Sequence, residues 1–333
     1  MSSVRQHPGV PTLAAALDEA LLADAPEPAL VLDDGPNSTS LGLKMAGDAR
    51  RVARGELTAA EFWARHDTAA AAEFGDAYRA TPDPDIGRTR AGGGLCAADA
   101  AGLQCSVGDI EPLAATEGER FDTGKRWGMV LDLQKCVGCD SCTVACKAEN
   151  RTPPNVTYNV VMEVEHGTVP DTRRVNMPRP CMQCENPPCV QVCPVSATYK
   201  MENGIVDIDY DRCIGCRYCL VACPYGARYS DFGLNYADES GEDGQVTSPE
   251  YGVRRGERAP FKSPIGNARK CSFCYHRLGR GEEPACVETC IGDARYFGDL
   301  NDEDSEVSRL AGSIRSFRLK EEDGTEPNVY YLR

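Results

Sequence analysis

Sixteen of the eighteen cysteines in this 333-residue chain fall into four tight groups, and no other feature restricts its fold as strongly. Short, repeated gaps of this kind are the spacing of metal ligands, whereas the disulfides of a small secreted protein are more scattered. The chain is long enough for one large domain or two modest ones. The groups are Cys136, Cys139, Cys142, Cys146; Cys181, Cys184, Cys189, Cys193; Cys213, Cys216, Cys219, Cys223; and Cys271, Cys274, Cys286, Cys290.

The cysteine-rich half of the chain also repeats itself. VLDLQKCVGCDSCTVAC at 130–146 aligns with VDIDYDRCIGCRYCLVAC at 206–223, and CVQVC at 189–193 matches CVETC at 286–290. In each long segment a short alternating strand leads into Cys-x-x-Cys-x-x-Cys-x-x-x-Cys. The pattern indicates a duplication on the scale of a domain, with a loop-like insertion in the second half near residues 235–262.

Thiolates in fours suit zinc or iron–sulfur clusters. Structural zinc usually takes two separated Cys-x-x-Cys knuckles, whereas groups one and three place three cysteines within seven residues, as in a loop that curls around a cubane. Zinc remains an alternative for group four alone, because the gap between Cys274 and Cys286 is wider. Gly138 and Gly215 lie at matching places and are expected to let the backbone approach a cluster.

The fourth cysteine of each group points to clusters in pairs. In the bacterial ferredoxin run Cys-x-x-Cys-x-x-Cys-x-x-x-Cys-Pro, the fourth cysteine ligates the other cluster of a two-cluster unit. Cys193 and Cys223 are both followed by proline, whereas Cys146 and Cys290 are not. Sixteen cysteines then hold four 4Fe-4S clusters, and the prolines hint at pairing groups two with three and one with four. Spacing alone leaves the pairing open.

The segments before the first group read differently. Residues 1–80 are predicted to form a helical N-terminal extension, with a capping-box start at Thr58 and Glu61, and residues 81–125 a linker rich in proline and glycine. Cys96 and Cys105 lie in that linker and are interpreted as plain thiols, because no ligand set surrounds them. Deletion of residues 1–120 is expected to leave the clusters intact.

The other boundaries follow from the motifs. Residues 126–298 are predicted to form the tandem cluster domain, and residues 299–333 a C-terminal docking helix and tail. Asn301 is the expected N-cap of that helix, which would present Val307, Leu310, Ile314 and Phe317.

Several residues beside the cysteines invite a role. Tyr218, Tyr225 and Tyr229 are expected to pack over a cluster, and Lys147 and Arg217 are interpreted as solvated basic residues, with a part in cluster potentials or partner contacts as the alternative. No catalytic constellation is visible. The four histidines are interpreted as surface or core residues and not as ligands: His7, His66, His166 and His276.

Charge and hydropathy exclude several classes. The formal net charge is −15, with 51 acidic residues against 36 basic ones, which disfavours nucleic acids and anionic lipid as partners. No apolar run approaches the roughly 18 residues of a membrane-spanning helix, so no direct span is predicted. No export signal is recognised near the N-terminus, and the Arg50-Arg51 pair is not followed by an apolar core.

The cysteine motifs resemble a known family, the four-cluster iron–sulfur subunits of complex molybdopterin oxidoreductases such as dimethyl sulfoxide, polysulfide, thiosulfate and tetrathionate reductases. The resemblance covers roughly residues 125–333. It rests on CVGCDSCTVACKAEN, CMQCENPPCVQVCP, CIGCRYCLVACPYGARY, KCSFCYHRL, ACVETC and the tail from FGDLNDEDSEVSRL to PNVYYL. It implies an α+β fold of two nested ferredoxin-like modules, each with two 4Fe-4S clusters, the outer one from groups one and four.

The resemblance also implies the ligands of each cluster. They are Cys136, Cys139, Cys142 and Cys290 for cluster 1; Cys271, Cys274, Cys286 and Cys146 for cluster 2; Cys181, Cys184, Cys189 and Cys223 for cluster 3; and Cys213, Cys216, Cys219 and Cys193 for cluster 4. A tryptophan in group three gives a 3Fe-4S cluster in the nitrate reductase branch. Here all four cysteines of that group are present, so four cubanes are expected.

The implied function is electron transfer without catalysis. A chain of this family relays electrons from cluster to cluster, with a molybdopterin-containing catalytic subunit next to cluster 1 and a quinone-reactive integral membrane subunit next to cluster 4. A respiratory sulfur-compound or dimethyl sulfoxide-type reductase is expected, with this chain as a peripheral subunit on a side of the membrane set by its partners. The alternatives are a soluble polyferredoxin shuttle and the iron–sulfur subunit of a hydrogenase or formate dehydrogenase complex.

Overall fold

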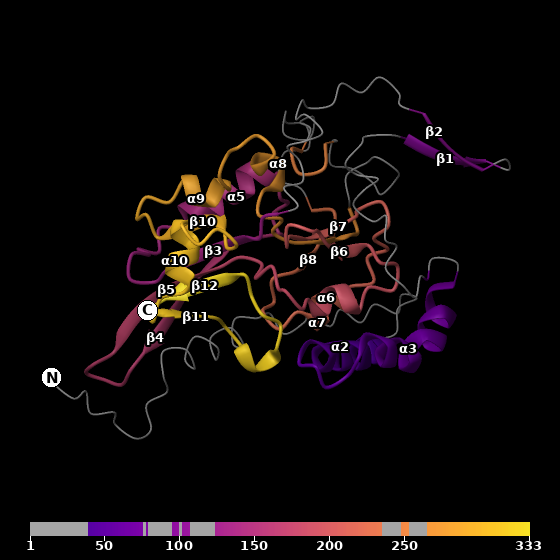
Figure 1. Ribbon diagram of the computed structural model, residues 1–333, viewed down its shortest axis with the longest axis horizontal. Coiled ribbons are helices and arrows are strands. Elements are labelled where there is room, and N and C mark those ends of the chain that lie inside the picture. The colour runs from indigo at the N-terminus through magenta and orange to yellow at the C-terminus, as the bar shows by residue number, and fades with distance from the viewer. Residues whose placement is uncertain are drawn as a thin grey trace.

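The computed structural model describes residues 39–75, 78, 124–234, 248–252 and 265–333, together with the backbone of residues 95–99 and 102–106. The cysteine-rich half forms the body of the molecule, and two helices that precede it in sequence lie along its outside (Figure 1). Short helices and strands alternate along the chain, in agreement with the predicted α+β class. The first part of the predicted helical extension, with His7, lies outside the described residues.

One four-stranded sheet runs through the body in the order β10-β3-β12-β11. Its strands are β10 (Arg295–Asp299), β3 (Trp127–Asp132), β12 (Val329–Leu332) and β11 (Ser316–Phe317). Strand β3 pairs antiparallel with β10 and parallel with β12, so it has a neighbour on each side. Its residues Met129, Val130 and Leu131 are fully buried, which makes β3 the centre of this core.

The other described strands form two-stranded antiparallel pairs. They are β1 (Leu95–Asp99) with β2 (Gly102–Ser106), β4 (Val160–His166) with β5 (Arg173–Arg179), β6 (Thr198–Lys200) with β7 (Val206–Ile208), and β8 (Tyr229–Ser230) with β9 (Ala268–Arg269).

The described helices are mostly short and lie next to cysteines. They are α2 (Thr39–Ala53), α3 (Ala59–Phe74), α5 (Ser141–Asn150), α6 (Pro188–Gln191), α7 (Tyr218–Ala222), α8 (Tyr275–Leu278), α9 (Ala285–Glu288), α10 (Glu306–Ala311) and the 3-10 turn η3 (Glu321–Asp323). Within the described part of the chain, no helix has both the length and the apolar character needed to cross a membrane.

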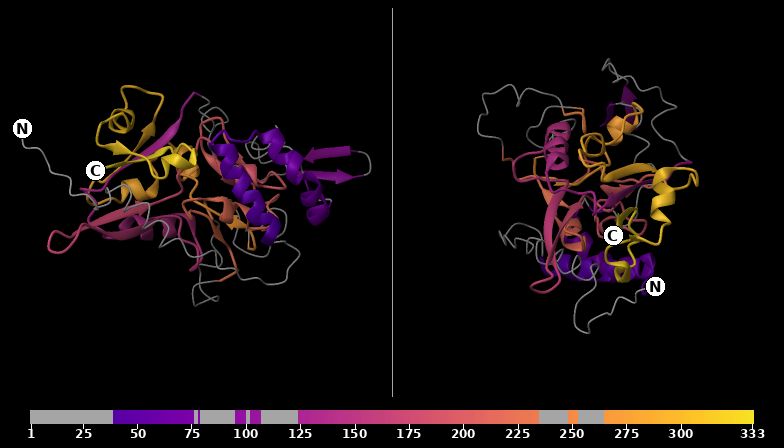
Figure 2. Two further views of the ribbon diagram at one scale, coloured as in Figure 1. Left: turned by 90° about the horizontal axis from the view of Figure 1, so that it is seen from below. Right: turned by 90° about the vertical axis from the view of Figure 1, so that its left-hand side faces the viewer.

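Helices α2 and α3 pack against the cysteine-rich half. Their position is at the opposite end of the molecule from the β4–β5 hairpin (Figure 2), and α2 contacts both α6 and α7. Met45, Ala46 and Ala49 of α2 have no exposed surface and belong to one apolar core with cysteines of groups two and three. This packing argues against the expectation that residues 1–120 can be removed without effect on the clusters.

The predicted capping box of α3 is confirmed. The backbone amide of Glu61 donates to the Thr58 hydroxyl at 3.2 Å, and the amide of Thr58 donates to the Glu61 carboxylate at 2.8 Å. Phe62 follows directly and is fully buried, so the cap fixes the point at which this helix turns its apolar side inward.

The backbone departs from the predicted linker between residues 95 and 106. Strands β1 and β2 form a hairpin there, in which Cys96 and Cys105 are partners in the antiparallel register. The alternation in LCAAD and GLQCS suits paired strands, and the proline- and glycine-rich composition of the flanking sequence concealed it.

The predicted C-terminal helix was wrong in its bounds. Ser305, not Asn301, is the N-cap, and its hydroxyl accepts from the amide of Ser308 at 3.1 Å. The helix ends at Ala311 with Gly312 as its C-cap, Ile314 is 93% exposed, and Phe317 belongs to β11. The chain leaves the helix early because it must return to the sheet, where β12 pairs with β3. A boundary after residue 298 would separate these two strands.

Candidate metal centre

The first cavity opens between the loop after β3 and the end of α9. Its thiols come from groups one and four: Cys136, Cys139, Cys142 and Cys290, hereafter set 1. Burial first, and then the thiols of Cys142 and Cys290, raise the pKa of Cys136. Cys139 is exposed, so this set reaches the molecular surface.

A second cavity lies beneath α6 and is lined by thiols of groups two and three. These are Cys181, Cys184, Cys189 and Cys223, hereafter set 3. Burial raises the pKa of Cys184 well above its ordinary value, and the other three thiols of the set raise it further. Tyr225 lines the same cavity, which agrees with its predicted packing role.

The thiols of two further sets are identified by their mutual electrostatic effects. Burial raises the pKa of Cys146 most, and the nearby thiols of Cys271, Cys274 and Cys286 raise it further. These four cysteines are set 2. Burial first, then Cys193, Cys219 and Cys213, raise the pKa of Cys216; these four are set 4. The structure therefore brings together the same cysteines that the resemblance groups, and the fourth cysteine of each sequence group lies with the first three of another.

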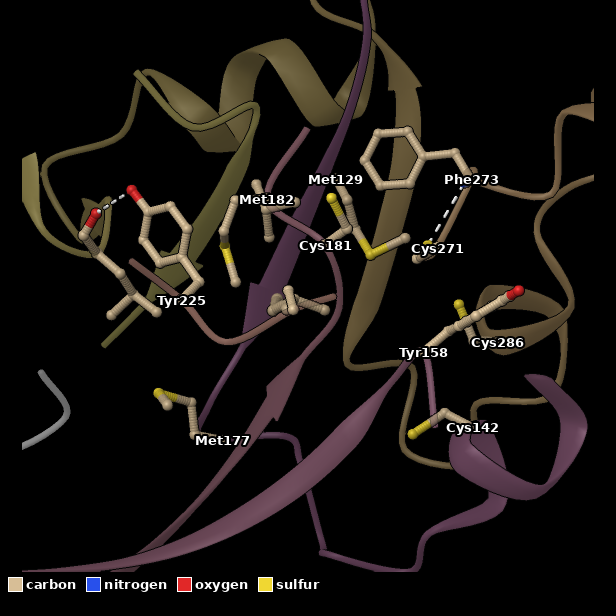
Figure 3. Close-up of a cluster of buried hydrophobic side chains, with 14 of the residues drawn as sticks. Met129, Cys142, Tyr158, Met177, Cys181, Met182, Tyr225, Cys271, Phe273 and Cys286 are labelled. Carbon is tan, nitrogen blue, oxygen red and sulfur yellow. Dashed lines mark hydrogen bonds between the residues drawn. The ribbon is translucent and has the colours of Figure 1, made fainter. Parts of the chain in front are cut away.

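The sets adjoin one another in a row. Cys142 of set 1 raises the pKa of Cys286 of set 2, and Cys181 of set 3 raises the pKa of Cys271 of set 2, in each case after the larger effect of burial. Figure 3 shows both pairs in the core around Met129. Cys189 of set 3 likewise raises the pKa of Cys219 of set 4. The order along the molecule is thus set 1, set 2, set 3, set 4.

The surroundings of the sulfurs fit thiolate ligands of a cluster. The amides of Ala197 and Thr198 donate to the Cys193 sulfur at 3.2 and 3.4 Å, and the amide of Ala294 donates to the Cys290 sulfur at 3.3 Å. Such donors favour the anionic form of sulfur and adjust cluster potentials. Within the described residues, no three or more histidine, cysteine or acidic side chains converge on a point suited to a single metal ion.

The two glycines of the repeated loops are required because another segment of the chain packs closely against each of them, and not only because a cluster lies nearby. Gly138 and Gly215 both have φ of 70°, in the left-handed region. A Cβ at Gly215 would lie 2.1 Å from the carbonyl oxygen of Gly266, and one at Gly138 would lie 2.7 Å from the Asn176 side chain. The duplicated loops therefore pack tightly against a second segment of chain.

Two of the basic residues noted in the sequence have structural partners. The Lys147 ammonium donates to the carbonyls of Pro153, Pro154 and Val156, so it fastens the loop after α5, and its interpretation as a solvated residue was wrong. Arg217 lies over the ring of Phe232, 4.8 Å from its centroid.

The histidines and one tyrosine also have defined surroundings. His66 pairs with Asp48 at 3.0 Å and His276 with Glu149 at 2.8 Å. The hydroxyl of Tyr218 donates to Glu73 of α3, so this residue joins set 4 to the N-terminal helices. The side chain of His166 lies outside the described residues.

Sequence reasoning missed several polar groups that touch the sulfurs. Asn150 donates to Cys146 and Cys274 at 3.5 and 3.8 Å, and Asn159 donates to Cys142 at 3.2 Å. The arginines at 228 and 295 were also missed, although both follow the fourth cysteine of their group by five residues, in CPYGAR and CIGDAR. That shared offset was a signal in the sequence.

Four sets of four thiols on an α+β scaffold define an iron–sulfur protein of the ferredoxin type. Residues 173–238 and 258–300 match a family model described as a 4Fe-4S dicluster domain. Residues 23–82 match a second family model, described as the N-terminal region of 4Fe-4S ferredoxin iron-sulfur binding. The segment before the cysteine-rich half is therefore also similar to known proteins.

Curated relatives make the class more specific. The chain is 59% identical over 210 residues to a selenate reductase subunit of Mesobacillus selenatarsenatis, a match that covers 62% of this chain and 72% of the relative. It is 41% identical over 219 residues to a putative dimethyl sulfoxide reductase iron-sulfur subunit of Halobacterium salinarum, covering 62% and 78%. It is 39% identical over 225 residues to the arsenate respiratory reductase iron-sulfur subunit of a Shewanella species, covering 62% and 96%.

The chain belongs to this family, the iron–sulfur subunits of multi-subunit reductases. It binds four 4Fe-4S clusters and transfers electrons, and it is not itself the catalytic subunit.

Proposed function

We propose that each of the four sets ligates one 4Fe-4S cluster, in the assignment given above. The convergence of four thiols in each set supports this assignment, as do the amides directed at Cys193 and Cys290. Sets 1 and 2 then belong to an outer ferredoxin-like module and sets 3 and 4 to an inner one nested within it in the sequence. Together the modules occupy residues 126–298, with β12 added from the C-terminus.

We further propose that the chain relays electrons between a molybdopterin-containing catalytic subunit and a quinone-reactive integral membrane subunit. The observation that carries this proposal is the unbroken row of sets. A bound 4Fe-4S cluster accepts and gives up one electron without other chemistry. The chain's own residues hold the centres in order, keep water from sets 2 and 3, and adjust the potentials through amides and charges.

The surface around set 1 supports a docking role for that end of the row. Val137, Val144 and Ile291 are 64%, 65% and 72% exposed, and each lies within two residues of a set 1 cysteine in the sequence. Among these cysteines, Cys139 is itself exposed. Exposed apolar side chains beside a redox centre are typical of a protein interface. We assign this end to the catalytic subunit.

The set 4 end has its own candidate interface. Phe232 and Leu234 are exposed large apolar residues, and α2 covers the adjoining helices α6 and α7. We assign this end to the membrane subunit, and peripheral attachment to the membrane follows from that partner. The names of the relatives support an oxyanion or sulfur compound as the substrate of the complex.

The test is native affinity purification of the full chain from gently solubilised membranes. Iron and molybdenum are quantified, and the co-purifying chains are identified. Molybdenum together with a membrane protein of several spans is the expected result. Iron on a soluble monomer would contradict the relay and leave a polyferredoxin shuttle, whereas a hydrogenase or formate dehydrogenase chain among the co-purifying proteins would identify the other alternative.

A further inference from the structure

Three cationic side chains are buried in the row of thiol sets. Arg228 and Arg295 are each 5% exposed, and Lys270 is 1% exposed. Among the described residues, none of the three forms an ion pair with a carboxylate. A buried charge is costly unless an opposite charge compensates it, so the compensation for these three must come from another group.

A neighbouring arginine shows the contrast. Arg269, next to Lys270 in sequence, is fully buried and pairs with two carboxylates, Asp231 at 3.0 Å and Glu250 at 2.8 Å. The fold therefore supplies acids to a buried cation where the role is structural. At Arg228, Lys270 and Arg295 it supplies neutral acceptors and sulfur instead.

Arg295 and Arg228 contact neutral acceptors and cysteine sulfurs, so within the described part of the chain their positive charges are not neutralised by a carboxylate and lie close to the thiols. Arg295 donates to the Cys142 sulfur at 3.2 Å and to Asn159 at 2.7 Å, and it lines the set 1 cavity. Arg228 lines the set 3 cavity and donates to Thr198 at 3.2 Å, while its second terminal nitrogen, Nη2, has no hydrogen-bond partner among the described residues.

Lys270 is held by backbone oxygens. Its ammonium donates to the carbonyl of Cys271 at 2.5 Å and to that of Val206. These contacts take up two of the three N–H groups of the ammonium and leave its positive charge without a counter-ion in the part of the chain that the structure describes.

Each cation lies where two sets adjoin. Arg295 faces Cys142 and Cys290 of set 1 and Cys286 of set 2, and these thiols raise its pKa against the opposing effect of burial. Lys270 directly precedes Cys271 of set 2, and its ammonium donates to the carbonyl of Val206, a residue that lines the set 3 cavity.

The third junction has the same arrangement. Arg228 faces Cys181, Cys189 and Cys223 of set 3 and Cys219 of set 4, and these thiols raise its pKa although burial opposes the rise. All three junctions of the row thus contain one buried cation.

We propose that Arg295, Lys270 and Arg228 each place one fixed positive charge at a junction between two sets. This charge stabilises the reduced form of the clusters on either side. The proposal rests on the ligand assignment above. Four thiolates make each bound cluster anionic, so reduction of one cluster opposes reduction of its neighbour. A cation between two sets stabilises the more negative, reduced form of both, and the effect is strong because burial keeps water from screening it. Both flanking clusters therefore accept an electron at a higher potential than they would without the cation.

The test is a potentiometric titration of the full chain with its clusters, followed by electron paramagnetic resonance, on Arg295→Gln, Lys270→Gln and Arg228→Gln. Each change should lower the ratio of reduced to oxidised cluster at a fixed potential about tenfold, which is ~59 mV for a one-electron couple. The effect should fall on the two flanking clusters: 1 and 2, 2 and 3, or 3 and 4, respectively.

The matched control is Lys135→Gln. Lys135 precedes the first cysteine of group one, as Lys270 precedes that of group four, but it is exposed, so water screens its charge. Its removal should change the ratio less than twofold. A shift as large as that of Lys270→Gln would overturn the proposal, because burial at a junction would then be irrelevant.

A glutamine variant that loses iron could not be titrated, so a variant that conserves the positive charge is also needed. Arg228→Lys should retain both flanking potentials within about twofold of the natural protein. A tenfold shift in this variant with full iron content would show that guanidinium shape, and not charge, sets the potentials, and would overturn the proposal. None of these titrations needs a partner subunit, so they stand apart from the purification test of the relay.

Discussion

Burial dominates the chemistry of the cysteines at the scale of the residue. It is the largest cause of the raised pKa of Cys189, about 11, and of Cys219, about 12. Iron requires thiolates, which these sites disfavour in its absence. Metal binding therefore supplies the positive charge that the buried sulfurs need, and the stability of this interior is coupled to its clusters.

Replacement of a single thiol tests the ligand sets. In Cys219→Ser, the cluster of set 4 should be lost or altered, while the signals of sets 1 and 2 persist, because the outer sets share no thiol with it. Electron paramagnetic resonance and iron content measure the result. Cys96→Ser is the control, since Cys96 lies outside every set, and it should leave all four signals unchanged. Four unchanged signals in Cys219→Ser would refute the assignment of set 4.

The glycine of the repeated loop gives a second residue-scale prediction. Gly215→Ala places a Cβ at a φ of 70° and 2.1 Å from a carbonyl oxygen, so it should destabilise by more than the roughly 1–3 kcal/mol of backbone strain alone. Gly55→Ala is the matched control, because its φ is 73° with open space around it, and it should cost about 1–2 kcal/mol. Thermal unfolding midpoints of the cluster-loaded proteins compare the two; equal shifts would show that the contact with Gly266 is unimportant.

At the scale of elements, α2 and α3 continue the core of the inner module. The ring of Phe74 packs edge-on against Tyr218, with 5.7 Å between the ring centroids, and Tyr218 directly precedes Cys219 in α7. A Cβ at Gly42 of α2 would lie 2.6 Å from the same tyrosine ring. Through these contacts, α2 and α3 pack over the set 4 cysteines at this end of the row.

A substitution in α2 tests this cover. Met45→Ala removes a fully buried side chain and should cost about 2–5 kcal/mol, with earlier loss of the set 4 cluster on heating. Leu43→Ala on the same helix is half exposed and should change stability by no more than about 0.5 kcal/mol. The measurement is the set 4 resonance signal as a function of temperature. If both variants behave alike, α2 is not part of this core.

Over the whole molecule, the row of sets is exposed at its set 1 end and most deeply buried at set 2. Cys139 of set 1 is exposed, whereas the cysteines of set 2 are all buried, and so are the first three of set 3. The clusters at the ends of a relay must come near their partners, and those in the middle gain from exclusion of water. This gradient should appear in the resistance of the clusters to chemical attack.

Removal of iron tests the gradient. In the isolated chain, oxidant with a chelator should destroy the cluster of set 1 first, because reagent reaches Cys139 directly, and those of sets 2 and 3 last. The time course of each resonance signal gives the order. In Met45→Ala, loss at set 4 should accelerate while the rate at set 1 stays the same. Simultaneous loss of all four signals would mean that the protein opens globally before any cluster is reached.

The cofactor and the internal repeat could both be predicted from the amino-acid sequence alone. Cysteine spacing is local, so the closely spaced cysteines of groups one and three identify a cluster loop whatever surrounds it. The capping box of α3 was predictable for the same reason, because Thr58 and Glu61 satisfy each other's amides within one turn.

The contacts between segments far apart in the sequence could not be predicted in this way, because they depend on the tertiary fold. The end of α10 and the path to β12 depend on pairing with β3, which lies far earlier in the chain, and local helix signals cannot report that. The same holds for α2 over α7 and for the cations at the junctions of the row. Whether an arginine is screened by water or held between two sets of thiols depends on burial, which packing creates and short-range sequence does not encode.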